Sequence, residues 1–248
     1  MKPTMALKPL VFALAALMAV AAQADSNRHP TPTPAATSGA SAVIADVQVS
    51  HDNNITNNGT LNSAKVTDSV KSTNGNVGVN VASGSGNQQD NAAAIASSDQ
   101  NFVLGTAAAV VSASQTNSYN KVNNHGTQNG ATLNDSIRNT SGNIGVNVSA
   151  GDLNQQKNNL AIAVSGGNLA SAAAGTVQTS NNLTVVNDLS SVSTHTPWHH
   201  PTTTRVPVSN NSTVNDSIKY TSGNVGANVS AGVGNQQNNS MVISKTSM

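Results

Sequence analysis

The sequence has no cysteine, no glutamate and very few aromatic residues. The absence of cysteine excludes disulfide bonds, thiolate metal sites and thiol catalysis. Aromatic residues make up 2% of the 248 residues and charged residues 8%, so the chain lacks both a base-stacking platform and a basic nucleic-acid surface. The net charge is only +1, so the chain also lacks the high charge that is typical of disordered proteins.

The chain is rich in side-chain amides. The chain holds 36 Asn, and after residue 24 Leu, Ile, Val and Phe make up 43 of 224 residues. That fraction is low for a protein that packs one large core. A polar, nearly uncharged chain rich in Asn and Val favours pairing of backbones with stacked amide side chains.

The N-terminus predicts export. Lys2 and Lys8 precede an apolar run over residues 10–22, and small residues stand at the cleavage positions Ala22 and Ala24. This pattern is typical of a secretory signal peptide over residues 1–24. The run is too short for a permanent membrane anchor. Residues 25–47 contain three prolines, at positions 30, 32 and 34, and predict a flexible leader.

Internal repeats organise the rest of the chain. Three segments align without gaps and share Gly-Asn-(Val/Ile)-Gly-(Val/Ala)-Asn-Val followed by Gly-x-x-Asn-Gln-Gln-x-Asn. A shorter similarity precedes each segment, beginning at Gln48, Gln115 and Gln178. The predicted divisions are repeat 1 (48–95, core 62–95), linker 1 (96–128, ending in the upstream part of repeat 2), repeat 2 core (129–162), linker 2 (163–209), repeat 3 core (210–243) and a C-terminal tail (244–248).

The repeats read as β-strands. Val77, Val79 and Val81 alternate with Gly78 and Asn80, and alternation of β-branched residues with period two indicates a strand. All eight prolines lie outside the repeats, as expected if the repeats are paired strands. We therefore predict an all-β fold, a repeat-based cross-β or β-solenoid stack of three imperfect strand-turn-strand repeats, which is disordered before assembly.

Stacked repeats place identical side chains over one another, so each amide can donate to the next in a ladder. The repeats are compatible with stacking within one molecule or between molecules. The Asp68, Asp135 and Asp216 row either faces solvent or lies beside the Lys71, Arg138 and Lys219 row. The predicted self-assembly ladder comprises Asn76, Val77, Val79, Asn80, Val81, Asn87, Gln88, Gln89, Asn143, Ile144, Val146, Asn147, Val148, Asn154, Gln155, Gln156, Asn224, Val225, Asn228, Val229, Asn235, Gln236 and Gln237.

The sequence offers no segment with a polar outer face that would cap the stack. An uncapped stack is open at its edges, which predicts that the chain polymerises end to end with itself. Catalysis is not predicted, because Asp-Ser recurs once per repeat as a ladder position does. No cofactor or metal site is predicted either. His195, Trp198, His199 and His200 could ligate a soft metal, but they lie in a Pro- and Thr-rich linker and are interpreted as a solvated segment.

These repeats, the signal peptide and the two unlike linkers resemble the secreted Fap functional-amyloid subunits of pseudomonads. The long linkers are more similar to the major fibre subunit than to the minor one, although the Cys-x-x-Cys associated with the major subunit is absent. The resemblance implies export through the periplasm and an outer-membrane pore, a minor subunit as partner, and extracellular fibrils in the biofilm matrix. The alternatives are the minor, nucleating subunit and a monomeric β-solenoid adhesin.

Overall fold

The computed structural model describes residues 39–98, 106–167, 169–194 and 202–246. These residues form 17 β-strands and no α-helix, which confirms the predicted all-β fold. No helix among them is long and apolar enough to cross a membrane. The predicted signal peptide and the 195–200 part of the His- and Trp-containing segment lie outside the described residues.

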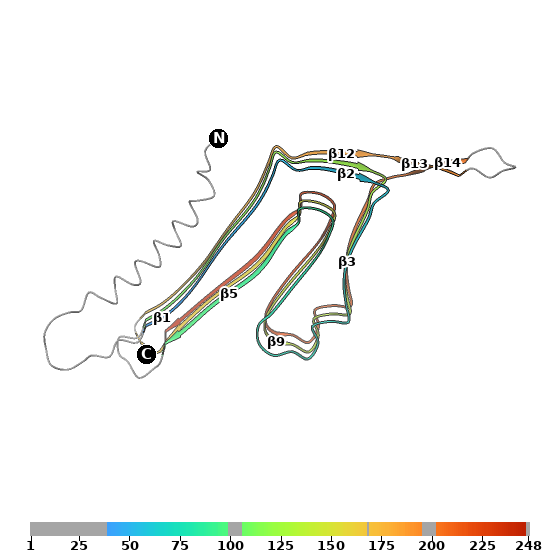
Figure 1. The fold of residues 1–248 in the computed structure, drawn as a ribbon. Helices are drawn as coiled ribbons and strands as arrows, with labels where there is room; N and C mark the ends of the chain where they lie inside the picture. The colour runs from blue at the N-terminus through green and yellow to red at the C-terminus, as the bar shows by residue number, and fades with distance from the viewer. Residues whose placement is uncertain (1–38, 99–105, 168, 195–201, 247–248) are drawn as a thin grey trace, which may run out of the picture.

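The chain follows the same winding path three times, and the three turns lie directly over one another (Figure 1). We call each turn a rung. Rung 1 comprises β1 (Gly39–His51), β2 (Asn54–Asn58), β3 (Leu61–Thr67), β4 (Val77–Ser83) and β5 (Gln88–Ser98). Rung 2 comprises β6 (Thr106–Ser118), β7 (Lys121–His125), β8 (Gln128–Asn134), β9 (Ser141–Ala150) and β10 (Gln155–Ser165). Rung 3 comprises β11 (Leu169–Asn181), β12 (Thr184–Asp188), β15 (Ser209–Asn215), β16 (Ser222–Ala231) and β17 (Gln236–Thr246).

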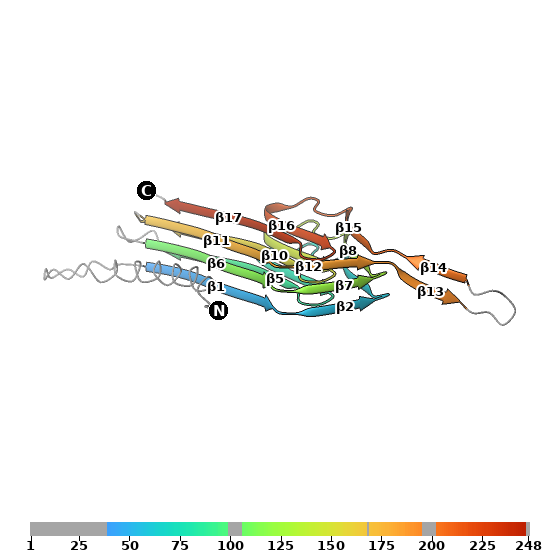
Figure 2. The same ribbon diagram turned by 90° about the horizontal axis from the view of Figure 1, so that it is seen from above.

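Equivalent strands pair in parallel and in register. Five three-stranded sheets result, and in each of them the strand of rung 2 lies between those of rungs 1 and 3. The stack is visible from the side in Figure 2. Asn147, for example, pairs with Asn80 below and with Asn228 above. The repeats therefore stack within one chain, and the arrangement is the predicted solenoid-like cross-β stack.

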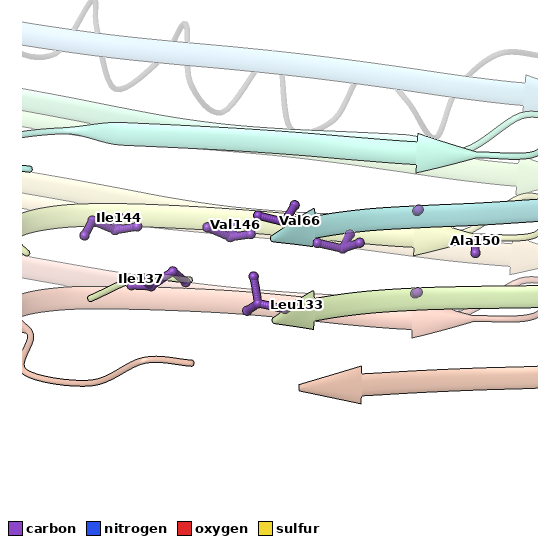
Figure 3. Close-up of a cluster of buried hydrophobic side chains, with 9 residues drawn as sticks. Val66, Leu133, Ile137, Ile144, Val146 and Ala150 are labelled. Carbon is purple, nitrogen blue, oxygen red and sulfur yellow. The ribbon is translucent and has the colours of Figure 1, made fainter. Parts of the chain in front are cut away.

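Two thin apolar cores lie inside each rung. One fills the space between β3 and β4 and their equivalents, and includes Leu133, Ile137 and Val146 (Figure 3). The other lies between β1 and β5 and their equivalents, and consists mainly of alanines such as Ala109 and Ala161. Small side chains let these sheets approach closely, so the second core forms without the large residues that the composition lacks.

A tight corner joins β3 to β4. Asp68, Val70 and Ser72 have φ angles of 54°, 55° and 51°, a left-handed region that β-branched residues rarely adopt. The equivalent positions of rungs 2 and 3 do the same. At the next turn, Gly142 has φ 121°, and an added Cβ would overlap the Gly75 carbonyl oxygen of the rung below. The corner turns the Asp and the basic residue three positions later to the same side.

Pairing extends beyond the predicted repeats, into the leader, both linkers and the C-terminal tail. Residues 39–47 were expected to be a flexible leader, but they form β1 and pair with β6. The predicted linkers 96–128 and 163–209 contain β6, β7, β11 and β12, all of them paired. Strand β17 likewise runs into the predicted tail, to Thr246. The Ala- and Ser-rich sequence of these strands looks like linker because backbone pairing needs no large apolar side chain.

One insertion does not join the stack. Strands β13 (Ser190–Thr194) and β14 (Thr202–Val206) form an antiparallel hairpin between β12 and β15. In rung 3 it occupies the place of the two residues Gly126 and Thr127, which join β7 to β8. Figure 1 shows the hairpin extending away from the path that the three rungs share.

Candidate self-assembly surface

The Asn80 column forms a continuous amide ladder. Asn147 Nδ2 donates to Asn80 Oδ1 at 2.9 Å, and Asn228 Nδ2 donates to Asn147 Oδ1 at 2.9 Å. This row does not face solvent in the middle of the stack, because Asn147 is fully buried between β9 and β10, where it also bonds Asn158. Buried amides that are fully hydrogen-bonded fix the stacking register.

The consecutive glutamines of β5, β10 and β17 form two further ladders. Gln155 Nε2 donates to Gln88 Oε1 at 2.8 Å, and Gln236 Nε2 donates to Gln155 Oε1 at 2.7 Å. In the neighbouring column the donors point the other way, from Gln89 to Gln156 and on to Gln237, at 2.7 and 2.8 Å. Adjacent glutamine columns therefore run in opposite directions along the stack.

The remaining predicted ladder residues also align in columns. Asn154 Nδ2 donates to Asn87 Oδ1 at 3.0 Å, and Asn235 Nδ2 donates to Asn154 Oδ1 at 2.8 Å. Asn224 Nδ2 donates to Asn143 Oδ1 at 2.8 Å, in the column that begins at Asn76. The predicted apolar positions of the ladder line the core shown in Figure 3 or pack against it. They are Val77, Val79, Val81, Ile144, Val146, Val148, Val225 and Val229.

Several ladders were missed by the sequence analysis. Gln48, Gln115 and Gln178 form one, with bonds of 2.9 and 2.8 Å. Others run through Asn57, Asn62 and Asn91 and their equivalents. The upstream similarity and the aligned repeat cores contain all of these residues, and the constant offset of 67 residues between rungs 1 and 2 is the signal that identifies their columns.

An alternating string of charges runs along the outer corner. Lys71 Nζ contacts Asp68 of its own rung and lies 3.0 Å from Asp135 Oδ2 of the next rung. Arg138 repeats the pattern, contacting Asp135 and lying 3.3 Å from Asp216 Oδ2. The string then ends with Lys219, which contacts Asp216. Of the two expectations for the acidic row, the structure places it beside the basic row, and both rows are partly exposed.

These contacts shift the pKa values of Lys71 and Asp135. The hydrogen bond from Lys71 lowers the pKa of Asp135, and the hydrogen bond to Asp68, followed by that to Asp135, raises the pKa of Lys71. A depressed carboxyl pKa stabilises the stack above the ordinary Asp pKa, and this contribution is lost as the pH falls through the lowered value. Both groups are solvent-accessible, so the contribution is modest and is screened by salt.

A buried cation was not foreseen. Lys157 is fully buried in the middle rung, with its Nζ 2.8 Å from Asp46 Oδ2 and in contact with Asp90. Asp90 occupies the same column as Lys157 in rung 1, and Asn238 occupies it in rung 3. This column therefore carries an acid, a base and an amide in the three successive rungs.

Both ends of the stack are open. In the part of the chain that the structure describes, the edge strands β1 to β5 of rung 1 and the five edge strands of rung 3 have no paired neighbour on their outer side. Open edges present unpaired backbone N–H and C=O groups to another chain. The predicted ladder columns also end there, with Asn80 exposed although Asn147 is fully buried. The two end rungs are thus the candidate surface for self-assembly.

Comparison with known proteins gave two positive results. The model of the functional amyloid protein FapB/FapC family matches residues 41–246. The chain is also 36% identical, over an alignment 324 positions long, to the functional amyloid subunit FapC of Pseudomonas aeruginosa, and the alignment covers 98% of this chain and 95% of the relative. No solved structure matches the chain.

Proposed function

Because this chain belongs to the FapB/FapC family of functional amyloid proteins, we propose that it is the structural subunit of an extracellular amyloid fibre and that it polymerises end to end. The observation that carries this proposal is the pair of open end rungs with matching columns. The family is one of structural amyloid subunits rather than enzymes, and we propose no catalytic role.

End-to-end growth follows from the geometry of the two ends. Rung 1 and rung 3 are different surfaces, so a contact between them is heterologous and leaves a free surface at each end of any oligomer. In a parallel, in-register stack each rung lies about 4.8 Å above the one before it, and successive copies do not rotate into a closed ring. Such an interface continues as a filament.

We further propose the major-subunit role for this chain. The similarity to FapC over nearly the full length of both chains supports this assignment. The predicted signal peptide supports a route through the periplasm. The proposal also includes an outer-membrane export pore, a minor subunit as partner, and fibrils in the biofilm matrix. The chain itself is the partner for which the described residues supply a surface.

Purified residues 25–248 are expected to start as a largely disordered monomer and to convert to fibres. One copy has little apolar area with which to offset its ordering entropy. Circular dichroism should show coil that becomes β-sheet with time, and fibre diffraction should show spacings of about 4.8 and 10 Å. A monomer with a stable, sharply melting β signal at the outset and no later fibres would identify a monomeric solenoid instead.

The hairpin insertion is expected to be dispensable for assembly. Replacing residues 189–208 by Gly-Thr, the two residues at 126–127, removes β13 and β14 and keeps the paired strands β12 and β15. The thioflavin lag time should change by no more than about two-fold, because loop length has a small effect on closure entropy. Deleting residues 210–243 removes β16 and most of β15 and β17 and should lengthen the lag much more. Equal effects of the two deletions would show that the hairpin belongs to the core.

A further inference from the structure

The string of charges along the corner ends differently at the two ends of the molecule. The four inner members of the string, Lys71, Asp135, Arg138 and Asp216, each form ion pairs with two residues. In the described chain Asp68 pairs only with Lys71, and Lys219 only with Asp216. Rung 1 therefore ends in a carboxylate whose side chain is 68% exposed, and rung 3 in an ammonium group whose side chain is 44% exposed.

The hydrogen bonds along the asparagine column all run in one direction, so this column also ends differently in rung 1 and in rung 3. Asn147 Oδ1 accepts two hydrogen bonds, from Asn228 and Asn158, both at 2.9 Å. Asn228 Oδ1 in rung 3 accepts one, from Asn239 at 2.8 Å, and so keeps room for a second donor. At the other end, Asn80 Nδ2 has no acceptor among the described residues, although Asn80 Oδ1 accepts from Asn147.

The Gln89 column has the opposite polarity. Gln89 donates to Gln156, and Gln156 donates to Gln237. Rung 3 therefore ends in an amide donor at Gln237 and rung 1 in an amide acceptor at Gln89. Each end of the molecule thus presents a pattern of donor, acceptor and charge that is complementary to the other end.

We propose that rung 3 of one copy receives rung 1 of the next copy, and that Lys219 forms an ion pair with Asp68 of that next copy. The proposal rests on the proposed fibre-forming function and adds the polarity and the residue pairing of the junction. In this junction the charges continue to alternate, Asn80 of the next copy donates to Asn228, and Gln237 donates to Gln89 of the next copy. The fibre is consequently polar, and all chains point the same way.

The opposite junction is disfavoured by the same groups. Placing rung 3 against rung 3, or rung 1 against rung 1, means turning one copy over, so equivalent strands no longer stack in register. Lys219 then loses the Asp68 carboxylate that faces it in the head-to-tail junction, and the amide columns lose their matching partners. Unpaired charges and mismatched amides act against wrong partners, so the ends themselves select one direction of stacking.

Two charge-reversed chains test the junction. In fibres of Asp68→Lys alone, each junction brings two ammonium groups together, and in fibres of Lys219→Asp alone it brings two carboxylates together. At low ionic strength each variant alone should elongate about five-fold more slowly than the wild type, an effect expected for exposed ion pairs that are reversed. In an equimolar mixture every junction between unlike chains has opposite charges. Elongation should recover, and labelled chains should alternate along the fibre, as measured by energy transfer between two dyes.

The control mixes Asp68→Lys with Arg138→Asp. Among the described residues Arg138 pairs only with Asp135 and Asp216 of its own chain. Both variants keep Lys219, so the lysine introduced at position 68 still meets an ammonium group, and incorporation of labelled Asp68→Lys chains should stay slow in this mixture. Elongation of Asp68→Lys alone or of Lys219→Asp alone at the wild-type rate, or no recovery in the first mixture while the wild type forms fibres, would overturn the proposed junction. Failure of the wild type to form fibres at all would instead overturn the proposed function.

Discussion

Replacing Asn80, Asn147 and Asn228 together by Asp is expected to abolish fibre formation near neutral pH. The three side chains lie in one column joined by hydrogen bonds of 2.9 Å, and the middle one is fully buried. Three carboxylates would stack about 4.8 Å apart. At an effective dielectric constant of about 20, each neighbouring pair repels by roughly 3 kcal/mol, and the penalty recurs in every molecule of the fibre.

The substitution also removes the donors that hold the ladder to its surroundings. Asn147 Nδ2 donates to the Asp90 carbonyl oxygen at 2.9 Å, and Asn228 Nδ2 donates to the Lys157 carbonyl oxygen at 2.9 Å. A buried acceptor that loses its donor costs about 1–3 kcal/mol. Both effects act in the same direction, so the loss should be large.

Acid should reverse the loss. Burial and neighbouring carboxylates raise the pKa of the introduced Asp groups above the ordinary value of about 3.9. Below their pKa values the carboxyl groups are neutral and can donate a hydrogen bond again. The thioflavin lag time of the triple variant should therefore be very long at neutral pH and should approach that of the wild type at acidic pH.

The matched control is the exchange of Asn181 and Asn182 for Asp. Both residues are exposed and lie at and just beyond the end of β11, where Asn182 has a left-handed φ of 52° that Asp tolerates. This variant should keep the wild-type lag at both pH values. If the ladder variant also kept the wild-type lag at neutral pH, the Asn80 column would face solvent in the fibre.

The sequence was sufficient to predict the stack because the three repeats carry its most regular features. Alternating Val and Asn in β4 and β9 predicts strands, and identical residues at a constant offset predict columns, as Asn80 and Asn147 show. Asn62 and Gln48 could have been assigned to columns by the same offset. The left-handed corner after β3 could not, because Val70, a β-branched residue, disfavours that conformation in isolation.

The strands β1, β6 and β11 escaped prediction for a different reason. They consist mainly of Ala, Ser and Val, and their alternation is weak because Ala lies on both faces. They pair with one another, and they bury their small side chains against the Ala-rich face of β5 and β10 only when the chain folds back on itself. The Lys157 site was hidden for the same reason, since Asp46 belongs to β1 and reaches Lys157 only when these sheets pack together.

Replacing Lys157 by Met is expected to slow fibre growth strongly, because two acidic side chains would lose their cation. Asp46 and Asp90 have side chains that are only 28% and 23% exposed, and Lys157 is fully buried between them. Removing one partner of a buried ion pair costs about 3–5 kcal/mol. Discounting for the residual exposure of the two carboxylates leaves about 2–3 kcal/mol, or roughly a 30- to 150-fold rise in the critical concentration.

A triple variant separates charge from packing. Combining Lys157→Met with Asp46→Asn and Asp90→Asn removes the whole charged cluster, and neutral replacement of a complete buried cluster is often neutral or stabilising. Asn at position 90 also matches Asn238, which occupies that column in rung 3. Soluble protein that remains after pelleting the fibres measures the critical concentration of each variant. It should rise for Lys157→Met and return toward the wild-type value for the triple variant; if both variants were equally impaired, Lys157 would act through its packed aliphatic chain and not through its charge.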